Sequence, residues 1–317
     1  MGAGKKPFTS QVAGHAGVSM SEDGSLLFKP ALPHEVAFYE HLTSDPGSAP
    51  LRRYIPKFYG TLRLEGQVED GNLETLHEAP APSEEKESIV LENLTHRFLK
   101  PNILDLKLGT RLHDDEASEE KKARMIEKAN DTTSSKTGLL LTGFQIHDTV
   151  TGQAVTVPRS YGKSLKPSDL PDGIAKFFPV HSEQLSQGLP KEQLLPVIES
   201  IRRHVAAVRD AFARLELRMI GGSFLIVYEG DLERAKQGIA LLGEGDSDED
   251  EEDDEDESDD EDEDEEKIKP CPPCLVKLID FAHTKVVTGR GPDEGVLLGM
   301  DTTLKLLDGR IAQIKQS

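Results

Sequence analysis

The sequence lacks the features of several protein classes. Its 317 residues contain no tryptophan and two cysteines, Cys271 and Cys274. No apolar run approaches the roughly 18 residues of a membrane span, and no apolar N-terminal signal is visible, so we expect a soluble intracellular protein. The cysteines form Cys-Pro-Pro-Cys, but zinc would need further ligands and a redox site would need a helix where the prolines stand. We interpret both thiols as reduced and structural.

The acidic charge is concentrated in one segment. The net charge is −21, yet residues 244–266 alone carry 20 carboxylates and no basic side chain. Without them, 38 acidic residues face 37 basic ones, so the remainder is balanced and can gather positive charge locally. We predict a disordered acidic insert at 244–267 that acts as a spacer. The alternative is a tract that binds basic proteins, with Ser247 and Ser258 as candidate phosphorylation sites.

Local patterns alternate between strands and helices, which predicts an α+β fold. Asp23 and Gly24 indicate a hairpin turn, and a short helix should begin soon after Pro33. Apolar residues spaced three and four apart predict a long helix, ended by Gly221-Gly222; they are Leu194, Ile198, Ile201, Val205, Val208, Phe212 and Leu215. Strands are expected in "YIPKFYGTLRLEG", "SIVLENLTHRF", "LLLTGFQIHD", "QAVTVP", "SFLIVY" and "CLVKLIDFAHT". The last two should pair with each other across the acidic insert. A polar loop is expected at 68–86, between the first two.

The stretch "PNILDLKLGT" holds two opposite charges in an apolar context. If residues 103–108 form a strand, three leucines share one face while Asp105 and Lys107 share the other. Burial of each leucine is worth roughly 1.5–3 kcal/mol, enough to fix the register and direct both charges the same way. The simpler alternative is an exposed ion pair worth about 0–1 kcal/mol.

Four separate features together match the needs of phosphoryl transfer from ATP. They are Lys29 at a strand end, Glu35 at a helix start, the pair Asp105 and Lys107, and Asp280 in "LIDFAH". The reaction needs a cation on the nucleotide phosphates, an acid that holds it, a carboxylate for Mg²⁺ and a cation near the transferred group. The pattern H-R-D-x-x-x-x-N is missing and D-F-A-H stands where D-F-G would, which excludes a protein kinase.

A longer pattern resembles a known family. Pro101, Asp105, Lys107 and Gly109 meet in full the signature P-x-x-x-D-x-K-x-G of the inositol polyphosphate kinases. Similar stretches are "GHAG", "GSLLFKP", "FYE", "LENLTH", "YGKSL", "DGIAKFF", "SFLIVYEG", "IDFAHT" and "DEGVLLGMDTTLKLL". "LENLTH" and the acidic insert resemble most the multikinase branch of the family, especially its fungal members. In "GGSFL", Gly222 replaces the first serine of the family's Ser-Ser-Leu-Leu.

The resemblance implies how ATP and Mg²⁺ would be bound. Lys29 would bind the nucleotide phosphates, and Glu35 would orient it. The backbone of Glu92 and Leu94 would hold adenine between two lobes. Asp280 would ligate Mg²⁺.

The resemblance also implies catalytic and substrate-binding roles. Asp105 would contact the ribose or the substrate hydroxyl and is the candidate for accepting its proton. Lys107 would bridge the γ-phosphate and the substrate. Ser223 keeps the family's second serine on the metal side. His283 would reach the inositol phosphate, although it could also be an ordinary loop histidine.

A basic helix at 115–130 follows the signature, where the family places its substrate-binding helix. An inositol ring with several phosphates requires a dense basic surface. Candidate substrate-binding side chains share one helix face or lie beside it; they are Lys121, Lys122, Arg124 and Lys128. The alternative is a solvated helix whose glutamates neutralise these bases.

We therefore predict a two-lobed fold that is protein-kinase-like or ATP-grasp-like, with a smaller sheet-rich lobe at 1–95 and a larger lobe at 96–317. The expected activity is ATP- and Mg²⁺-dependent phosphorylation of soluble inositol tris- and tetrakisphosphates towards the pentakisphosphate. One alternative is a degenerate kinase fold serving as an acidic scaffold in transcription or chromatin complexes. Another is a phosphotransferase for a different small hydroxylated substrate. We expect a monomer without direct nucleic-acid binding, located in nucleus and cytoplasm.

Overall fold

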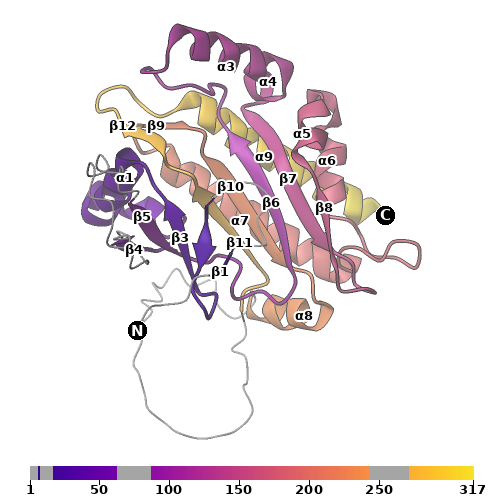
Figure 1. The fold of residues 1–317 in the computed structure, drawn as a ribbon. Coiled ribbons are helices and arrows are strands. Elements are labelled where there is room, and N and C mark those ends of the chain that lie inside the picture. The colour runs from indigo at the N-terminus through magenta and orange to yellow at the C-terminus, as the bar shows by residue number, and fades with distance from the viewer. Residues whose placement is uncertain (1–5, 8–16, 63–86, 243–270) are drawn as a thin grey trace, which may run out of the picture.

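The computed structural model describes residues 6–7, 17–62, 87–242 and 271–317. Within these residues, the strands form two five-stranded antiparallel sheets and one two-stranded ladder (Figure 1). The first sheet has the order β1-β2-β3-β5-β4, from β1 (Lys6–Pro7), β2 (Ser19–Met20), β3 (Leu26–Pro30), β4 (Phe58–Leu62) and β5 (Ser88–Glu92). The second has the order β11-β10-β6-β7-β8, from β6 (Pro101–Leu108), β7 (Leu139–His147), β8 (Ala154–Val157), β10 (Ser223–Glu229) and β11 (Cys274–Ile279). The ladder pairs β9 (Leu217–Ile220) with β12 (His283–Val286).

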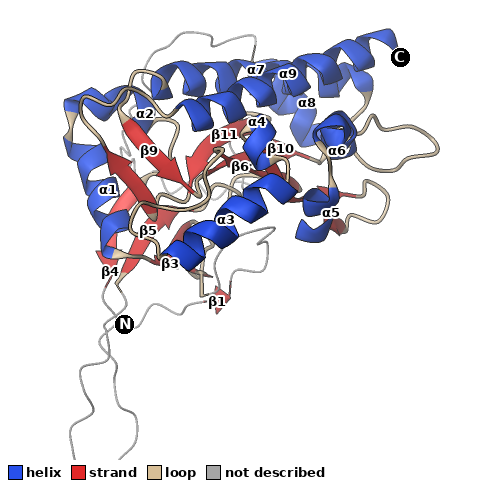
Figure 2. Ribbon diagram, turned by 90° about the horizontal axis from the view of Figure 1, so that it is seen from above, coloured by secondary structure: helices blue, strands red, loops and turns tan. Residues whose placement is uncertain are grey.

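Helices cover mainly one face of the second sheet. The long helices α7 (Lys191–Phe212) and α9 (Glu294–Gln316) pack side by side behind it (Figure 2). The remaining helices are α1 (Pro33–Ser44), α2 (Ala49–Arg52), α3 (Glu119–Asp131), α4 (Ser134–Thr137), α5 (Arg159–Ser164), α6 (Leu170–Phe177) and α8 (Leu232–Leu241), with short 3₁₀ turns at Pro46–Ser48 and Pro167–Asp169. The helices α3 and α4 lie at the end of the second sheet where β6 ends (Figure 1).

The sequence predicted most of these elements. The hairpin pairs Ser19 with Phe28, α1 begins at Pro33, and β10 pairs with β11 on either side of the acidic insert. The predicted apolar stripe of α7 is buried from Leu194 to Phe212. The prediction that Gly221-Gly222 ends this helix was wrong.

The helix α7 ends at Phe212, and the strand β9 follows before the two glycines. The reason is a change of period: Leu217 and Met219 alternate with polar residues and are buried where β9 pairs with β12. The helix α8 was not predicted; Asp231 caps its start by accepting hydrogen bonds from the N–H groups of Glu233 and Arg234.

The signature strand β6 has the predicted two faces. Leu104, Leu106 and Leu108 are fully buried against the helices, which fixes the register that directs Asp105 and Lys107 to the other side. The signature glycine, Gly109, ends the strand with a φ of 101°, a conformation that side chains other than glycine strongly disfavour. The last residue of the signature is therefore required by the backbone.

Besides the covalent connection from β5 to β6, hydrogen bonds link the second sheet to the chain segment just before β4. The N–H of Leu278 donates to the Tyr54 carbonyl at 2.7 Å, and the Lys277 ammonium donates to the Arg53 carbonyl at 2.7 Å. These bonds hold the turn between α2 and β4 against the edge strand β11. The lobe boundary between residues 95 and 96 stays a prediction, and the predicted loop at 68–86 and insert at 244–267 lie outside the described residues.

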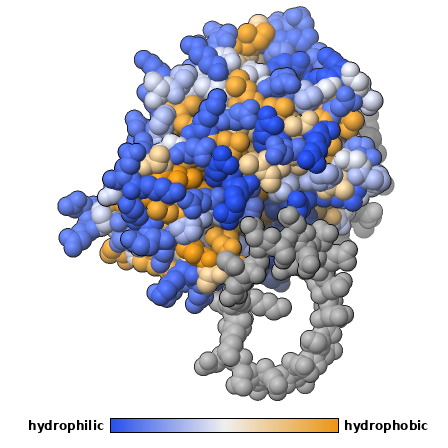
Figure 3. All heavy atoms as spheres, turned by 180° about the vertical axis from the view of Figure 1, so that it is seen from behind, coloured by the Kyte–Doolittle hydropathy of each residue, from blue (hydrophilic) through white to orange (hydrophobic). Residues whose placement is uncertain are grey.

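The surface of the described chain is largely hydrophilic on the side of α7 and α9, as seen from behind in Figure 3. No helix in the described ranges is both long enough and apolar enough to cross a bilayer. Cys271 and Cys274 are free thiols, and burial raises the pKa of Cys274 to about 12, so it stays protonated.

Candidate active site

Three charged residues meet between the two sheets. The Lys29 ammonium on β3 lies 2.8 Å from Glu35 Oε1 on α1 and 2.6 Å from Asp280 Oδ1 after β11. Burial opposes the charge of Lys29, but Asp280 and Glu35 outweigh burial and raise the pKa of Lys29. The lysine is therefore a fixed cation between the carboxylate of Glu35 on α1 and that of Asp280 after β11.

Asp280 reaches this position through an unusual backbone. Its φ is 66°, in the left-handed region, and among the described residues no other non-glycine residue has a positive φ. The turn directs the carboxylate away from the strand axis of β11 and towards Lys29. Such local strain is found where a side chain must be held for function.

Asp105 and Lys107 lie on the same face of β6, opposite the three leucines, but they do not pair with each other. The Lys107 ammonium donates to the Gly221 carbonyl at 2.5 Å. Asp105 is 5% exposed, and its Oδ1 atom accepts no hydrogen bond from the described residues. The simple surface ion pair is therefore not what the structure contains.

The Asp105 carboxyl has a strongly perturbed acidity. Burial and the nearby charge of Asp280 raise its pKa to about 6, against the opposing charge of Lys107. A carboxyl with this pKa can take up a proton near neutral pH, which suits a proton acceptor.

This pKa predicts a pH-dependent difference in stability. The folded protein holds the Asp105 proton more tightly than an unfolded chain, so the stabilisation is complete below about pH 4 and is lost as the pH rises through 6. An Asp105→Asn variant lacks this titration. It should gain about 2.4 kcal/mol in free energy of unfolding relative to the unmutated protein between pH 4 and 7.5, measured by urea denaturation.

An Asp308→Asn variant is the control, because Asp308 lies on the outer surface of α9 in an exposed pair with Arg202. Its stability difference from the unmutated protein should be the same at both pH values. An Asp105→Asn difference that does not change with pH would contradict the raised pKa.

The oxygen atoms near Asp280 fit a divalent metal ion bound together with a nucleotide. Asp105 Oδ1 and Ser223 Oγ are both buried and lack hydrogen-bond partners within the described chain, and Ser223 pairs with Lys107 across β10 and β6. Mg²⁺ prefers oxygen ligands and often binds through one or two carboxylates plus substrate phosphates. In the described residues no group of three histidine, cysteine or acidic side chains could hold an ion by itself, so phosphates would have to complete the shell.

Gly222 departs from the family pattern for a local reason. A Cβ atom there would lie 2.6 Å from Met219 Sδ, so the methionine side chain occupies the space of a larger residue. Its carbonyl still accepts a hydrogen bond from the Leu108 N–H at 2.9 Å. The chain therefore offers the hydroxyl of Ser223, and no hydroxyl at Gly222, beside Lys107.

The backbone between the sheets has the groups expected for adenine binding, with one restriction. The Glu92 N–H donates to the Lys57 carbonyl at 3.0 Å, so Glu92 would contribute its carbonyl. Leu94 follows in a turn and is 9% exposed. The role of both residues stays a prediction.

A cluster of basic side chains lies beyond Lys107. Burial first, and then the charges of its neighbours, lower the pKa of Lys128. These neighbours are Lys163, Lys107, Arg159 and Arg124. We call these five residues from α3, β6 and α5 the basic cluster. Like charges repel, so they persist together only where a polyanion or solvent compensates them.

Sequence reasoning found the α3 members of the basic cluster and missed Arg159 and Lys163. The signal was present in "YGKSL", where Gly162 allows α5 to touch β7: a Cβ atom on Gly162 would lie 1.7 Å from the Leu141 carbonyl oxygen. The contact brings Lys163 beside α3. Lys122 is engaged with Glu119 at 2.8 Å, and Lys121 is not among the neighbours whose charges lower the pKa of Lys128.

His283 has a partner that the sequence did not indicate. Its Nδ1 atom lies 3.1 Å from Asp114 Oδ2, and Lys285 on the same strand pairs with Glu116 at 2.8 Å. Both contacts fasten the segment before α3 to β12. Ala129 is the one residue of α3 that is buried, so the helix has little apolar packing of its own. The two ion pairs therefore help to hold it in place.

A fixed lysine between two carboxylates, a second buried carboxylate and a basic cluster define a two-lobed phosphotransferase for a small anionic acceptor. The chain belongs to the inositol polyphosphate kinase family: the family's sequence model, described as "Inositol polyphosphate kinase", matches residues 88–308. The predicted family, fold class and kinase activity are therefore confirmed, and the scaffold alternative is not favoured.

Relatives and solved structures agree with this assignment. The chain is 32% identical to the inositol polyphosphate multikinase of Saccharomyces cerevisiae, over 93% of this chain and 96% of the relative. It is 28% identical to inositol hexakisphosphate kinase 3 of Mus musculus, over 69% of this chain but only 50% of that relative. The crystal structure of an inositol phosphate multikinase from S. cerevisiae with ADP and Mn²⁺ matches with a TM-score of 0.64 and 28% identity, over 90% of this chain and 99% of that chain.

Proposed function

We propose that this protein is an ATP- and Mg²⁺-dependent inositol polyphosphate multikinase, which phosphorylates soluble inositol tris- and tetrakisphosphates towards the pentakisphosphate. The observation that carries the proposal is that the basic cluster includes Lys107 and so adjoins Asp105, which in turn lies near Asp280 and its partner Lys29. One side of the site suits a metal–nucleotide complex and the other a ring with several phosphates.

In this reaction the substrate hydroxyl oxygen attacks the γ-phosphorus while the bond to the β–γ bridging oxygen breaks and ADP leaves. Asp105 takes the hydroxyl proton. Lys29 and Lys107 bind the phosphate oxygens, and Glu35 keeps Lys29 in place. Asp280 and Ser223 would hold the metal, which neutralises charge on the phosphates when bound.

The direct test is transfer of ³²P from labelled ATP to a panel of inositol tris-, tetrakis- and hexakisphosphates and to vesicles containing inositol lipids. We expect label on the tris- and tetrakisphosphates. Label on the hexakisphosphate alone would contradict the multikinase assignment, and no transfer to any acceptor would contradict the whole proposal.

Removal of cations from the basic cluster should weaken substrate binding selectively. In the Lys128→Ala and Lys163→Ala variants, the KM for an inositol phosphate should rise about tenfold each, because a charge-assisted hydrogen bond is worth about 1.5–3 kcal/mol. The KM for ATP should stay within twofold. A Lys236→Ala variant removes an exposed lysine from the distant helix α8 and should change neither KM value. If Lys128→Ala or Lys163→Ala raised the KM for ATP as much as the KM for the inositol phosphate, the assignment would be contradicted.

We also propose that the protein is monomeric, acts in nucleus and cytoplasm, and uses residues 244–266, which carry 20 carboxylates, as a spacer. The alternative is that this tract binds basic partners. Deletion of this tract should leave turnover unchanged if it is a spacer. Loss of a basic partner in pull-down with unchanged turnover would favour the interaction role.

A further inference from the structure

The segment between the two sheets is held more firmly than a flexible hinge would be. We call residues 93–100, from the end of β5 to the start of β6, the connector. It begins beside Glu92 and Leu94, the predicted adenine-binding backbone, and it ends where the strand of Asp105 and Lys107 begins. Its position therefore sets the distance between the adenine site and the catalytic strand.

The first half of the connector is fixed to the first sheet through Asn93. The Asn93 N–H donates to the Ser25 carbonyl, and its side-chain amide donates to the Gly24 carbonyl, both at 2.7 Å. Its Oδ1 accepts from the N–H and hydroxyl of Thr95 at 3.1 and 2.8 Å. Asn93 thus joins the connector to the hairpin that precedes Lys29.

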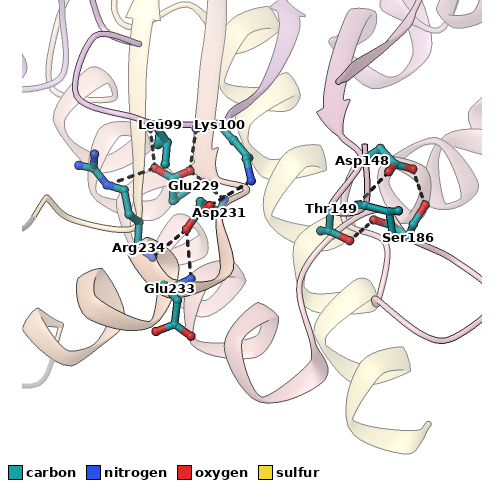
Figure 4. A network of polar contacts seen from close by, with 10 residues as sticks. Leu99, Lys100, Asp148, Thr149, Ser186, Glu229, Asp231, Glu233 and Arg234 are labelled. Carbon is teal, nitrogen blue, oxygen red and sulfur yellow. Dashed lines mark hydrogen bonds and ion pairs between the residues drawn. The ribbon is translucent and has the colours of Figure 1, made fainter. Parts of the chain in front are cut away.

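The second half is fixed to the second sheet through Glu229, the last residue of β10 (Figure 4). This carboxylate is 3% exposed and accepts hydrogen bonds from the N–H groups of Leu99 at 2.8 Å and Lys100 at 2.9 Å. It also accepts from the Asp231 N–H at 2.9 Å, and the Arg234 guanidinium lies 3.9 Å away. Pro101, the first residue of β6, has no N–H group to donate to a neighbouring strand. The side chain of Glu229 instead binds the N–H groups of the two residues before it.

Neighbouring contacts support the same attachment. The Arg234 guanidinium donates to the Arg97 carbonyl at 3.0 Å, and the Lys100 ammonium pairs with Asp231 at 3.0 Å. A buried carboxylate that accepts several N–H groups is a strong and directional anchor, and a neutral amide cannot replace it because its NH₂ group would face a donor.

We propose that Glu229 is a positioning residue for ATP. It fixes the connector, and so holds the adenine-binding backbone at the distance from Asp105 and Lys107 that places the γ-phosphate for transfer. The inference rests on the proposed function for the location of adenine. No role follows for Glu229 from the reaction itself, since it lies at the opposite end of β10 from Ser223.

The test is a Glu229→Gln variant of the full chain, with ADP and GDP binding measured by calorimetry and ATP kinetics measured in parallel. The Kd for ADP and the KM for ATP should rise about tenfold, the equivalent of one well-aligned hydrogen bond. The preference for ADP over GDP should fall, because a displaced connector reads the base less well. The kcat should also fall, because a displaced adenine-binding backbone places the γ-phosphate less well for transfer, while the KM for inositol trisphosphate should stay within twofold.

Two control variants separate positioning from general destabilisation. Glu233→Gln is the same substitution at an exposed site in the first turn of α8, and it should change neither the Kd for ADP nor the kinetic parameters (Figure 4). Ile201→Val trims the buried core of α7 and lowers stability by about 0.5–1.5 kcal/mol, yet should leave ADP affinity unchanged. If Glu229→Gln folds poorly, Arg234→Gln removes the bond to the Arg97 carbonyl and the ion pair with Glu229, leaves the Glu229 carboxylate in place, and should weaken ADP binding in the same direction.

An unchanged ADP affinity and base preference in Glu229→Gln, with a lowered thermal midpoint, would overturn the proposal. So would a uniform loss of all kinetic parameters. Failure of the proposed function looks different: the unmutated protein would bind ADP but transfer phosphate to no inositol phosphate, and the nucleotide-binding comparison would still test Glu229.

Discussion

Replacement of Asp280 by asparagine is expected to lower kcat by at least about a thousandfold, or roughly 4 kcal/mol of transition-state stabilisation. The variant loses the charge that would bind the metal and that faces Lys29 at 2.6 Å. The fold should survive, because asparagine tolerates the left-handed φ of 66° at this position and Lys29 keeps Glu35 as a partner. Steady-state transfer of ³²P to inositol trisphosphate measures the loss.

The matched control is the Asp308→Asn variant, the same substitution in an exposed ion pair on α9, which should keep full activity. Circular dichroism and thermal unfolding check that Asp280→Asn is folded. Activity within tenfold of the unmutated protein would remove Asp280 from the site and would contradict the assignment of the metal ligand.

Replacement of Lys107 by alanine should also lower kcat by about a thousandfold. Lys107 provides the cation between the two reactants, where charge on the transferred group must be neutralised. The carbonyl of Gly221 loses its donor at 2.5 Å, but it lies in a turn that water can reach after truncation, so the cost in stability should be small. The defect should appear in kcat more than in the KM for ATP, since Lys29 still binds the nucleotide.

A Lys305→Ala variant is the control, because Lys305 is exposed on α9 behind the second sheet. It should match the unmutated protein in both kcat and KM. A Lys107→Ala variant that loses only ATP affinity would show that this lysine binds nucleotide and does not assist transfer.

The signature and the strand pattern predicted the central part of the site. Three leucines on one face of β6 required Asp105 and Lys107 on the other, because side chains alternate along a strand. The separation of Arg159 and Lys163 from α3 in the sequence explains why they were missed: a pattern within one element cannot show which other element packs beside it. Glu229 was quoted within a motif, but nothing local indicated that its carboxylate binds the residues before Pro101.

The sequence by itself determined the family, the catalytic strand and the long helix α7, because these depend on local period and on residue types at fixed spacing. Only the tertiary structure decided the partners of the charged groups. Lys107 binds the Gly221 carbonyl, and His283 binds Asp114. The physical reason is that an electrostatic or hydrogen-bond partner is chosen by proximity in space, and strands far apart in the chain become neighbours only when the sheets form.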